Sequence, residues 1–248
     1  MYFRLAVLIT LICLAFGDVI QKSDEGDVNV SQSVSAQDKE GCGSPTMPCK
    51  TLPYASRQCQ TQYRSCSFVI DGGAEKGSYA YILNGNDSFS VVNMGIRVQA
   101  KAGGSTPVIV CNQTGRYDSC FNVNGRRISV DGFEFVSTSA DGQLREETSS
   151  PSKDFVNSDA KPMLVFSGGQ PGSSITNCQF HDVTINIETV TIISNWFMTG
   201  SQVKWQQYAP TTLQGCDFRG CNFQIEGGPP LNMNGTMMIQ TTFNVTGE

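Results

Sequence analysis

The sequence SSITNCQF, residues 173–180, returns as TTLQGCDF at residues 211–218. Each copy reads two hydroxyl residues, an aliphatic residue, a polar residue, Asn or Gly, cysteine, a polar residue and phenylalanine. The aliphatic residue stands five positions before the phenylalanine, and this spacing recurs along the chain. The pairs are Val130/Phe135, Ile175/Phe180, Ile192/Phe197, Leu213/Phe218 and Met238/Phe243.

The position three before each phenylalanine is never apolar. Its occupants are Gly132, Asn177, Ser194, Gly215 and Gln240. Gly and Asn suit a corner that needs a positive φ, and Ser194 and Gln240 depart from this pattern. After Phe180 the phenylalanines follow one another roughly every twenty residues, the length of a coil of three short strands. Stacked coils would place equivalent residues above one another about 4.8 Å apart, so the repeat predicts an all-β solenoid.

Short strands separated by Gly, Asn and Asp fit this prediction, because no crossover helices fit between them. One helix is expected over 51–63, where Thr51 can cap and Pro53 suits an early helical position. The expected strands lie at 67–70, 88–92, 95–100, 107–111, 121–123 and 163–166.

Several stretches resemble one known family. They are GCGSPTMPCKTLPYAS (41–56), SCSFVIDGG (65–73), GIRVQAKAGGSTPVIVC (95–111) and FNVNGRRISVDGFEF (121–135). They are similar to the N-terminal cap and first coils of the right-handed parallel β-helix proteins of the pectin-lyase-like fold. The resemblance covers roughly residues 41–248 and implies a right-handed parallel β-helix with a short N-terminal capping helix.

The start of the chain is typical of a secretory signal peptide over 1–17. Arg4 precedes an apolar run, Leu5 to Phe16, and Ala15-Phe16-Gly17 is a small-x-small cleavage pattern. A polar, flexible lead-in is expected at 18–40 and the β-helix domain at 41–248, and the chain as a fragment of a longer solenoid is one alternative. A polar insertion at 137–161 is expected to form a loop between coils, either a tolerated surface insertion or a binding loop.

Composition favours an extracellular protein. The net charge is −5, which argues against nucleic acid and anionic lipid as partners. Five sequons begin at Asn29, Asn86, Asn112, Asn234 and Asn244. Together with a signal peptide they indicate a eukaryotic glycoprotein without membrane insertion after cleavage.

The cysteines of the mature chain fall into neighbouring pairs with one left over. The pairs are Cys42/Cys49, Cys59/Cys66, Cys111/Cys120 and Cys216/Cys221. Adjacent pairing is the simplest hypothesis, although sequence alone leaves the connectivity open. Cys178 is either a buried stacked thiol or the partner of Cys216 or of another chain. No pair has the spacing of a zinc site, so no metal is expected.

The resemblance to polysaccharide lyases, hydrolases and esterases keeps an enzyme among the alternatives, but the paired-Asp and Gly-His-Gly signatures of the family's hydrolases are absent. The strings INIET and FQIEG place Glu188 and Glu226 at equivalent positions, and Asp217 could complete an acidic patch. Their alternative role is as solvated, outward-facing residues. No cofactor is expected, except Ca²⁺ under the lyase alternative.

Histidine and aromatic residues offer two further candidates. His181 would need an orienting partner to act as a base, and it is otherwise a lone surface histidine. Trp196, Trp205 and Tyr208 could form a platform for sugar stacking, or Trp196 could pack into the core.

Together these features predict a secreted or cell-surface glycoprotein with a non-catalytic, structural or adhesin-like β-helix that binds a glycan or an extracellular protein. The alternative is a divergent polysaccharide lyase or glycoside hydrolase. A solenoid exposes apolar coil edges at its ends. An end-to-end contact at an uncapped C-terminal coil is therefore also expected.

Overall fold

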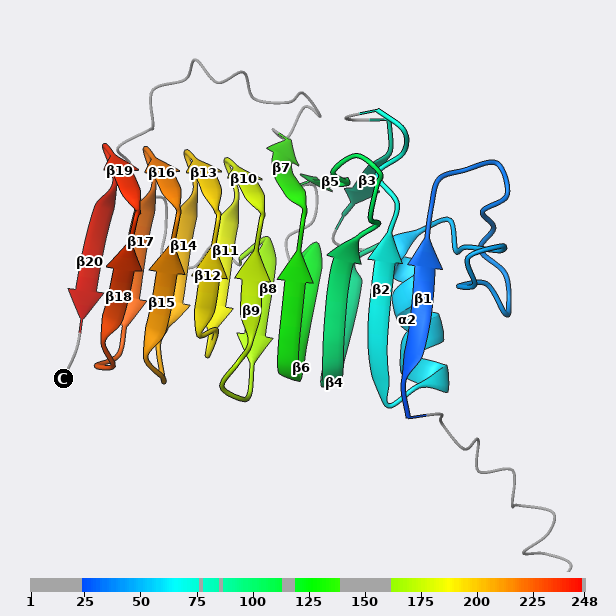
Figure 1. Cartoon of the computed structure of the whole chain (residues 1–248), viewed down its shortest axis with the longest axis horizontal. Helices are drawn as coiled ribbons and strands as arrows, with labels where there is room; N and C mark the ends of the chain where they lie inside the picture. The colour runs from blue at the N-terminus through cyan, green and yellow to red at the C-terminus, as the bar shows by residue number, and fades with distance from the viewer. Residues whose placement is uncertain (1–23, 76–77, 85–86, 113–118, 139–161, 247–248) are drawn as a thin grey trace, which may run out of the picture.

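The computed structural model describes residues 24–75, 78–84, 87–112, 119–138 and 162–246. In this part of the chain, parallel strands wind into a β-helix and a single helix packs beside the N-terminal coils (Figure 1). The all-β parallel solenoid expected from the repeat is confirmed. The expected signal peptide at 1–17 lies outside the described residues.

The strands have the following bounds. The first eight are β1 (Gly26–Val30), β2 (Ser65–Ile70), β3 (Ala80–Leu83), β4 (Phe89–Ala100), β5 (Val108–Asn112), β6 (Phe121–Asp131), β7 (Glu134–Thr138) and β8 (Leu164–Gly168). Four coils of three strands follow: β9 (Ser174–Thr176), β10 (Gln179–His181), β11 (Thr184–Glu188); β12 (Ile192–Ser194), β13 (Phe197–Thr199), β14 (Gln202–Gln206); β15 (Thr211–Gln214), β16 (Asp217–Arg219), β17 (Asn222–Glu226); β18 (Leu231–Asn234), β19 (Met237–Ile239), β20 (Thr242–Thr246).

The coil has three outer surfaces. Flank A is formed by β9, β12, β15 and β18 together with the second half of β6. Flank B is the seven-stranded sheet in the order β19-β16-β13-β10-β7-β5-β3. Flank C is formed by β8, β11, β14, β17 and β20 together with the first half of β6.

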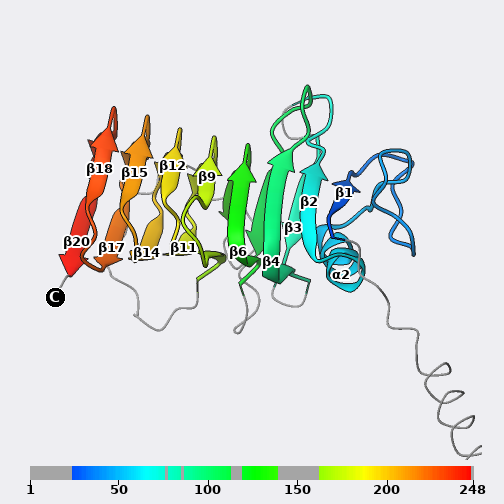
Figure 2. The ribbon, with the colours of Figure 1, turned by 60° about the horizontal axis from the view of Figure 1, so that its bottom comes forward.

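Flanks A and C merge at β6. The first residues of β6 pair with β8, and its last residues pair with β9. On the N-terminal side, β6 pairs along its length with β4, which replaces the two separate strands expected at 88–92 and 95–100. A register shift at Asn93 and Met94, where Asn93 has φ 64°, lets β4 remain one strand. The change from long strands to split strands is visible along the molecule (Figure 2).

The repeated octapeptide is the corner and strand of two coils. Ile175 aligns with Val130 on one side and with Ile193 on the other, and Ile193 aligns with Leu213. In flank B, Phe180 aligns with Phe135, and Met198 stands between Phe180 and Phe218. All of these side chains are buried. SSITNCQF and TTLQGCDF therefore lie two coils apart in the same stacks.

Aromatic rings form much of the core. Phe89 and Phe121 stack with centroids 4.7 Å apart, and Phe135 and Phe180 stack at 5.2 Å. Trp196 follows at 4.7 Å from Phe180. Such pairs contribute about 0.5–1.5 kcal/mol each beyond the burial of their area.

Left-handed residues make the corner between flanks A and B. They are Gly132, Asn177, Asn195, Gly215 and Gly235. The corner expected at Gly132, Asn177 and Gly215 is confirmed. In addition, the Asn195 Nδ2 donates a 2.8 Å hydrogen bond to Asn177 Oδ1, which joins the corners of neighbouring coils. A second series of left-handed residues makes the corner between flanks B and C: Asp182, Gly200, Gly220 and Gln240.

The repeat assignment at Ile192 and Phe197 is wrong by one residue. Ile192 is 46% exposed, and Phe197 is half-buried on the outer surface of flank B. The corner lies at Asn195 rather than Ser194, so Ile193 and Met198 point inward. In the strings IIS and FMT, large apolar residues stand at neighbouring positions. The alternation of inward and outward side chains therefore fitted Ile192 and Phe197 as well as Ile193 and Met198.

The assignment in the last coil is also wrong. Met238 aligns with Phe218, so it holds the phenylalanine position, and Met233 holds the aliphatic position beside Leu213. Phe243 belongs to flank C, where it stacks on Phe223 at 4.4 Å. Met238 is 46% exposed, because no further coil among the described residues covers it.

The N-terminal helix α2 (Leu52–Gln62) begins where the sequence predicted, with Thr51 as its cap. Leu52, Ala55 and Cys59 are buried against the coils. α2 contacts β1 and β4 and lies at the N-terminal end of the solenoid (Figure 1).

The lead-in expected at 18–40 is not wholly flexible, because residues 26–30 form β1, which pairs with β2. Val28 and Val30 are buried and alternate with Asp27 and Asn29, a short alternation hidden in a polar tract. Of the insertion expected at 137–161, Ser137 and Thr138 belong to β7, and the rest lies outside the described residues.

Candidate functional site

Three of the four expected disulfides are formed. They are Cys42–Cys49, Cys59–Cys66 and Cys111–Cys120. The pair Cys216/Cys221 is wrong, because both are free and buried. Cys216 follows Gly215 at one corner and Cys221 follows Gly220 at the other, so strand β16 separates them.

Cys178 is a buried free thiol, which is the first of the two alternatives that the sequence left open. Cys178 directly follows the corner residue Asn177. Trp196 and Cys216 follow the corner residue of the next two coils in the same way, so Trp196 lies between Cys178 and Cys216 in the stack. Burial raises the pKa of Cys178 to about 12 and that of Cys221 to about 11. Both thiols stay protonated at neutral pH and are poor nucleophiles.

The structure does not bring the three acidic candidates together. Glu188 and Glu226 lie on flank C with Gln206 between them. Their backbones are therefore two strand spacings apart, at about 4.8 Å for each spacing. Asp217 lies on flank B, where its Oδ2 is 2.8 Å from Nη2 of Arg219. The acidic patch expected from Glu188, Glu226 and Asp217 is therefore not formed.

The two flank C carboxylates are held by polar neighbours. Ser167 donates a 2.9 Å hydrogen bond to Oε2 of Glu188, and Asn186 donates one of 3.1 Å to its Oε1. Gln224 donates a 3.2 Å hydrogen bond to Oε1 of Glu226, and Lys204 approaches the same oxygen at 3.6 Å. These carboxylates form a surface ladder on one sheet, whereas glycoside hydrolysis needs two carboxyl groups on either side of a bound sugar.

His181 is not a lone surface histidine. Its Nδ1 lies 2.9 Å from the Thr199 hydroxyl, and its Nε2 lies 3.8 Å from Oε1 of Glu134. Its side chain is only 19% exposed, and its ring centroid is 5.9 Å from that of Phe197. The Thr199 hydroxyl can therefore orient the ring, whereas Glu134 lies beyond hydrogen-bond distance at 3.8 Å.

The expected aromatic platform is reduced to one residue. Trp196 and Trp205 are buried, and the Trp196 indole donates a 3.0 Å hydrogen bond to the Ile175 carbonyl. Tyr208 is 68% exposed, and its hydroxyl donates to Oε1 of Gln206 at 3.3 Å. The ring therefore stands at the edge of the flank C ladder.

The sequons differ in exposure. Asn29 is half-buried and its Nδ2 donates a 2.9 Å hydrogen bond to the Gly43 carbonyl, whereas Asn234 and Asn244 are exposed on the last coil. Asn86 lies outside the described residues. Asn112 ends β5, and Thr114 of its sequon lies outside them.

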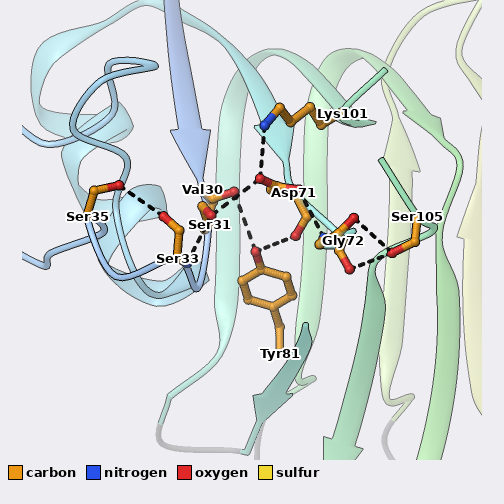
Figure 3. Close-up of polar contacts among 10 residues, drawn as sticks. Val30, Ser31, Ser33, Ser35, Asp71, Gly72, Tyr81, Lys101 and Ser105 are labelled. Atoms are coloured by element: carbon orange, nitrogen blue, oxygen red, sulfur yellow. Dashed lines mark hydrogen bonds and ion pairs between the residues drawn. The ribbon is translucent and has the colours of Figure 1, made fainter. Parts of the chain in front are cut away.

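A polar network that the sequence analysis did not single out surrounds Asp71, at the end of β2 (Figure 3). Its Oδ2 accepts hydrogen bonds from Lys101 Nζ at 3.0 Å and from Ser31 Oγ at 3.4 Å. Its Oδ1 accepts from the Gly73 amide at 3.0 Å, and its carbonyl accepts from the Tyr81 hydroxyl at 2.8 Å. The network joins β1, β2, β3 and the turn after β4.

The charge of Asp71 is stabilised by these contacts. Burial alone would raise the pKa of the carboxyl, but the Gly73 amide, Lys101 and Ser31 together hold it below its ordinary value. For Tyr81, burial raises the pKa, and the negative charge of Asp71 adds to the effect. At neutral pH this corner therefore carries an ionised Asp71–Lys101 pair and a neutral tyrosine.

A pocket of about 290 Å³ opens beside this network. Two glycine-containing turns form its rim, 71–74 and 101–104, and Tyr79 lines it as well. The only sequence signals for it were the strings DGG and AGG in the stretches that resemble β-helix first coils. Because the two turns are a full coil apart in the chain, only the winding of the solenoid brings them together.

Comparison of the chain with protein-family models, curated proteins and solved structures finds no match. In addition, no helix in the described part of the chain is long and apolar enough to cross a membrane.

Proposed function

We propose that this protein is a secreted or cell-surface glycoprotein, related to the pectin-lyase-like β-helix proteins, whose non-catalytic β-helix binds an extracellular glycan through flank C. Its three disulfides suit an oxidising compartment, and the exposed sequons at Asn234 and Asn244 suit glycosylation there. The role is structural or adhesin-like.

The observation that carries the proposal is the polar ladder of flank C. Ser167, Glu188, Gln206, Glu226 and Thr246 align across consecutive strands. A parallel column contains Asn186, Lys204 and Gln224.

The ladder presents hydroxyl, amide and carboxylate groups at intervals of about 4.8 Å along the solenoid. Amides and hydroxyls both donate and accept hydrogen bonds, as sugar hydroxyls do. Tyr208 adds an exposed, amphipathic ring next to Gln206. The ladder runs along the outer surface of a sheet, which suits binding of an extended chain.

A panel of wall and matrix polysaccharides tests the proposal. The secreted protein is incubated with each polysaccharide, with and without Ca²⁺, and retained protein and released reducing or unsaturated ends are measured together. Retention without release is expected. It should weaken in Gln206→Ala and Tyr208→Ala and persist in Gln214→Ala, a matched outward glutamine on flank A.

Two results would overturn the proposal. Released ends that disappear in Glu188→Gln would establish a polysaccharide lyase or glycoside hydrolase instead. Retention by no polysaccharide would refute glycan binding, and a protein partner would then be the remaining ligand class.

A further inference from the structure

The pocket beside Asp71 has the electrostatics of a site for a neutral, polar ligand. Asp71 and Lys101 face each other at 3.0 Å, so their charges cancel within the pocket. An anion entering it would meet the ionised Asp71, and a cation would meet Lys101. A ligand that donates to a carboxylate and accepts from an ammonium group at neighbouring atoms fits both residues without carrying a net charge.

Part of the hydrogen-bonding capacity of the pair remains open to a ligand. An ammonium group has three N–H donors, and the Lys101 side chain is 56% exposed while one donor binds Asp71. The Asp71 side chain keeps 17% of its surface exposed. Two adjacent hydroxyl groups of a sugar ring can bridge such a pair, one as donor and the other as acceptor.

The rest of the lining suits a sugar ring. Tyr79 is half-buried at the pocket, and aromatic faces pack against the apolar faces of sugars. The backbone of Gly104 does not have a positive φ, and an added Cβ would not clash with its neighbours, so neither reason requires glycine at this position. A Cβ there would make only ordinary contacts, 3.5 Å from Asp71 Oδ1 and from the Gly73 carbonyl. The absence of a side chain at this position keeps the pocket open.

The volume of about 290 Å³ lies just below the range of about 300–1,000 Å³ that is usual for small-molecule sites, so the pocket has room for a ligand of the size of one sugar ring. We propose that this pocket, lined by Asp71, Tyr79, Lys101 and Gly104, binds a single neutral sugar unit, such as the terminal residue of a glycan. This inference rests on the proposed glycan-binding function and adds a second, separate site at the N-terminal end of the solenoid.

The experiment uses titration calorimetry of the secreted protein with methyl glycosides of glucose, galactose, mannose and xylose. Glucuronate and glucosamine serve as anionic and cationic probes. At least one neutral glycoside is expected to bind saturably, and more tightly than either charged probe. Lys101→Met should weaken binding about tenfold, since a hydrogen bond to a charged group is lost. Gly104→Leu should abolish binding by filling the pocket.

Lys39→Met, which removes an exposed lysine elsewhere, serves as the matched control and should bind as the unchanged protein does. Binding of no neutral glycoside, tighter binding of glucuronate or glucosamine, or unchanged binding by Gly104→Leu would overturn the inference. The flank C variant Tyr208→Ala separates the two proposals. It should keep monosaccharide binding while losing polysaccharide retention, whereas Gly104→Leu should keep retention, so each proposal can fail alone.

Discussion

Replacing Phe180 and Phe197 by alanine tests the register of the solenoid directly. The two phenylalanines share a sequence motif, but Phe180 is fully buried and Phe197 lies half-buried on the outer surface of flank B. Met198, not Phe197, occupies the stack between Phe180 and Phe218. The two substitutions should therefore have very different effects on stability.

The expected magnitudes follow from burial. A phenylalanine buries about 150–250 Å², worth roughly 4–6 kcal/mol at about 25 cal/mol per Å², and Phe→Ala in cores costs about 3–5 kcal/mol. Phe180→Ala also removes the stack on Phe135 and the contact with Trp196, so we expect a loss of about 4 kcal/mol. Phe197→Ala loses a half-buried ring and its contact with Arg219 at 5.4 Å, which amounts to about 1 kcal/mol.

Urea unfolding followed by circular dichroism measures both losses. With a slope of about 2–3 kcal/mol per molar, the midpoint should fall by roughly 1.5 M in Phe180→Ala and by less than about 0.5 M in Phe197→Ala. Met198→Ala serves as the internal comparison and should cost about 2–5 kcal/mol. If Phe197→Ala were as damaging as Phe180→Ala while Met198→Ala was mild, the register described here would be wrong.

Four further predictions concern the corners, the Asp71 network and the cysteines. Gly215→Ala should cost about 1–2 kcal/mol because φ is 63°, while Gly215→Asn, the residue used in neighbouring corners, should cost clearly less in urea unfolding; equal costs would contradict the left-handed corner. The pKa of Asp71 is lowered on folding, so its charge stabilises the fold above its unfolded pKa of about 4, and this contribution is lost as pH falls through the lower folded value. Asp71→Asn should therefore destabilise the protein at pH 7 and much less near pH 2, and a gap in melting temperature independent of pH would refute this. Replacing Cys42 and Cys49 together by alanine should cost about 2.5 kcal/mol for so short a loop. Cys178 should react with iodoacetamide only after unfolding, and labelling of the native protein would contradict its burial.

The sequence predicted the architecture because the solenoid repeats its own local rules. Gly132, Asn177 and Gly215 marked corners whose left-handed backbone follows from residue type. Thr51 and Pro53 marked the start of α2 for similarly local reasons. Three disulfides closed short loops between neighbouring cysteines, as the simplest pairing predicted.

The features that the sequence did not predict depend on which of two neighbouring residues points inward and on contacts between coils. Alternation could not choose between Ile192 and Ile193, since both are aliphatic, and only the corner at Asn195 decides. The pair Cys216/Cys221 has the short spacing of the other pairs, but strand β16 lies between the two cysteines and both are free. The pocket at Asp71 joins turns from successive coils, and no local pattern states which turns will be neighbours.

The division of the sheet at β6 also has a mechanical consequence. The hydrogen bonds between coils point along the long axis of the molecule. Tension along that axis therefore pulls neighbouring strands directly apart, one strand at a time, and does not slide them past each other in shear. On the C-terminal side of β6 the flanks are separate short strands, and each coil can peel away by itself. A coil of about twenty residues would release roughly 65–70 Å of extended chain per step. From β6 toward the N-terminus, β6 and β4 span two flanks at once, so the same tension must detach a much longer strand in one event.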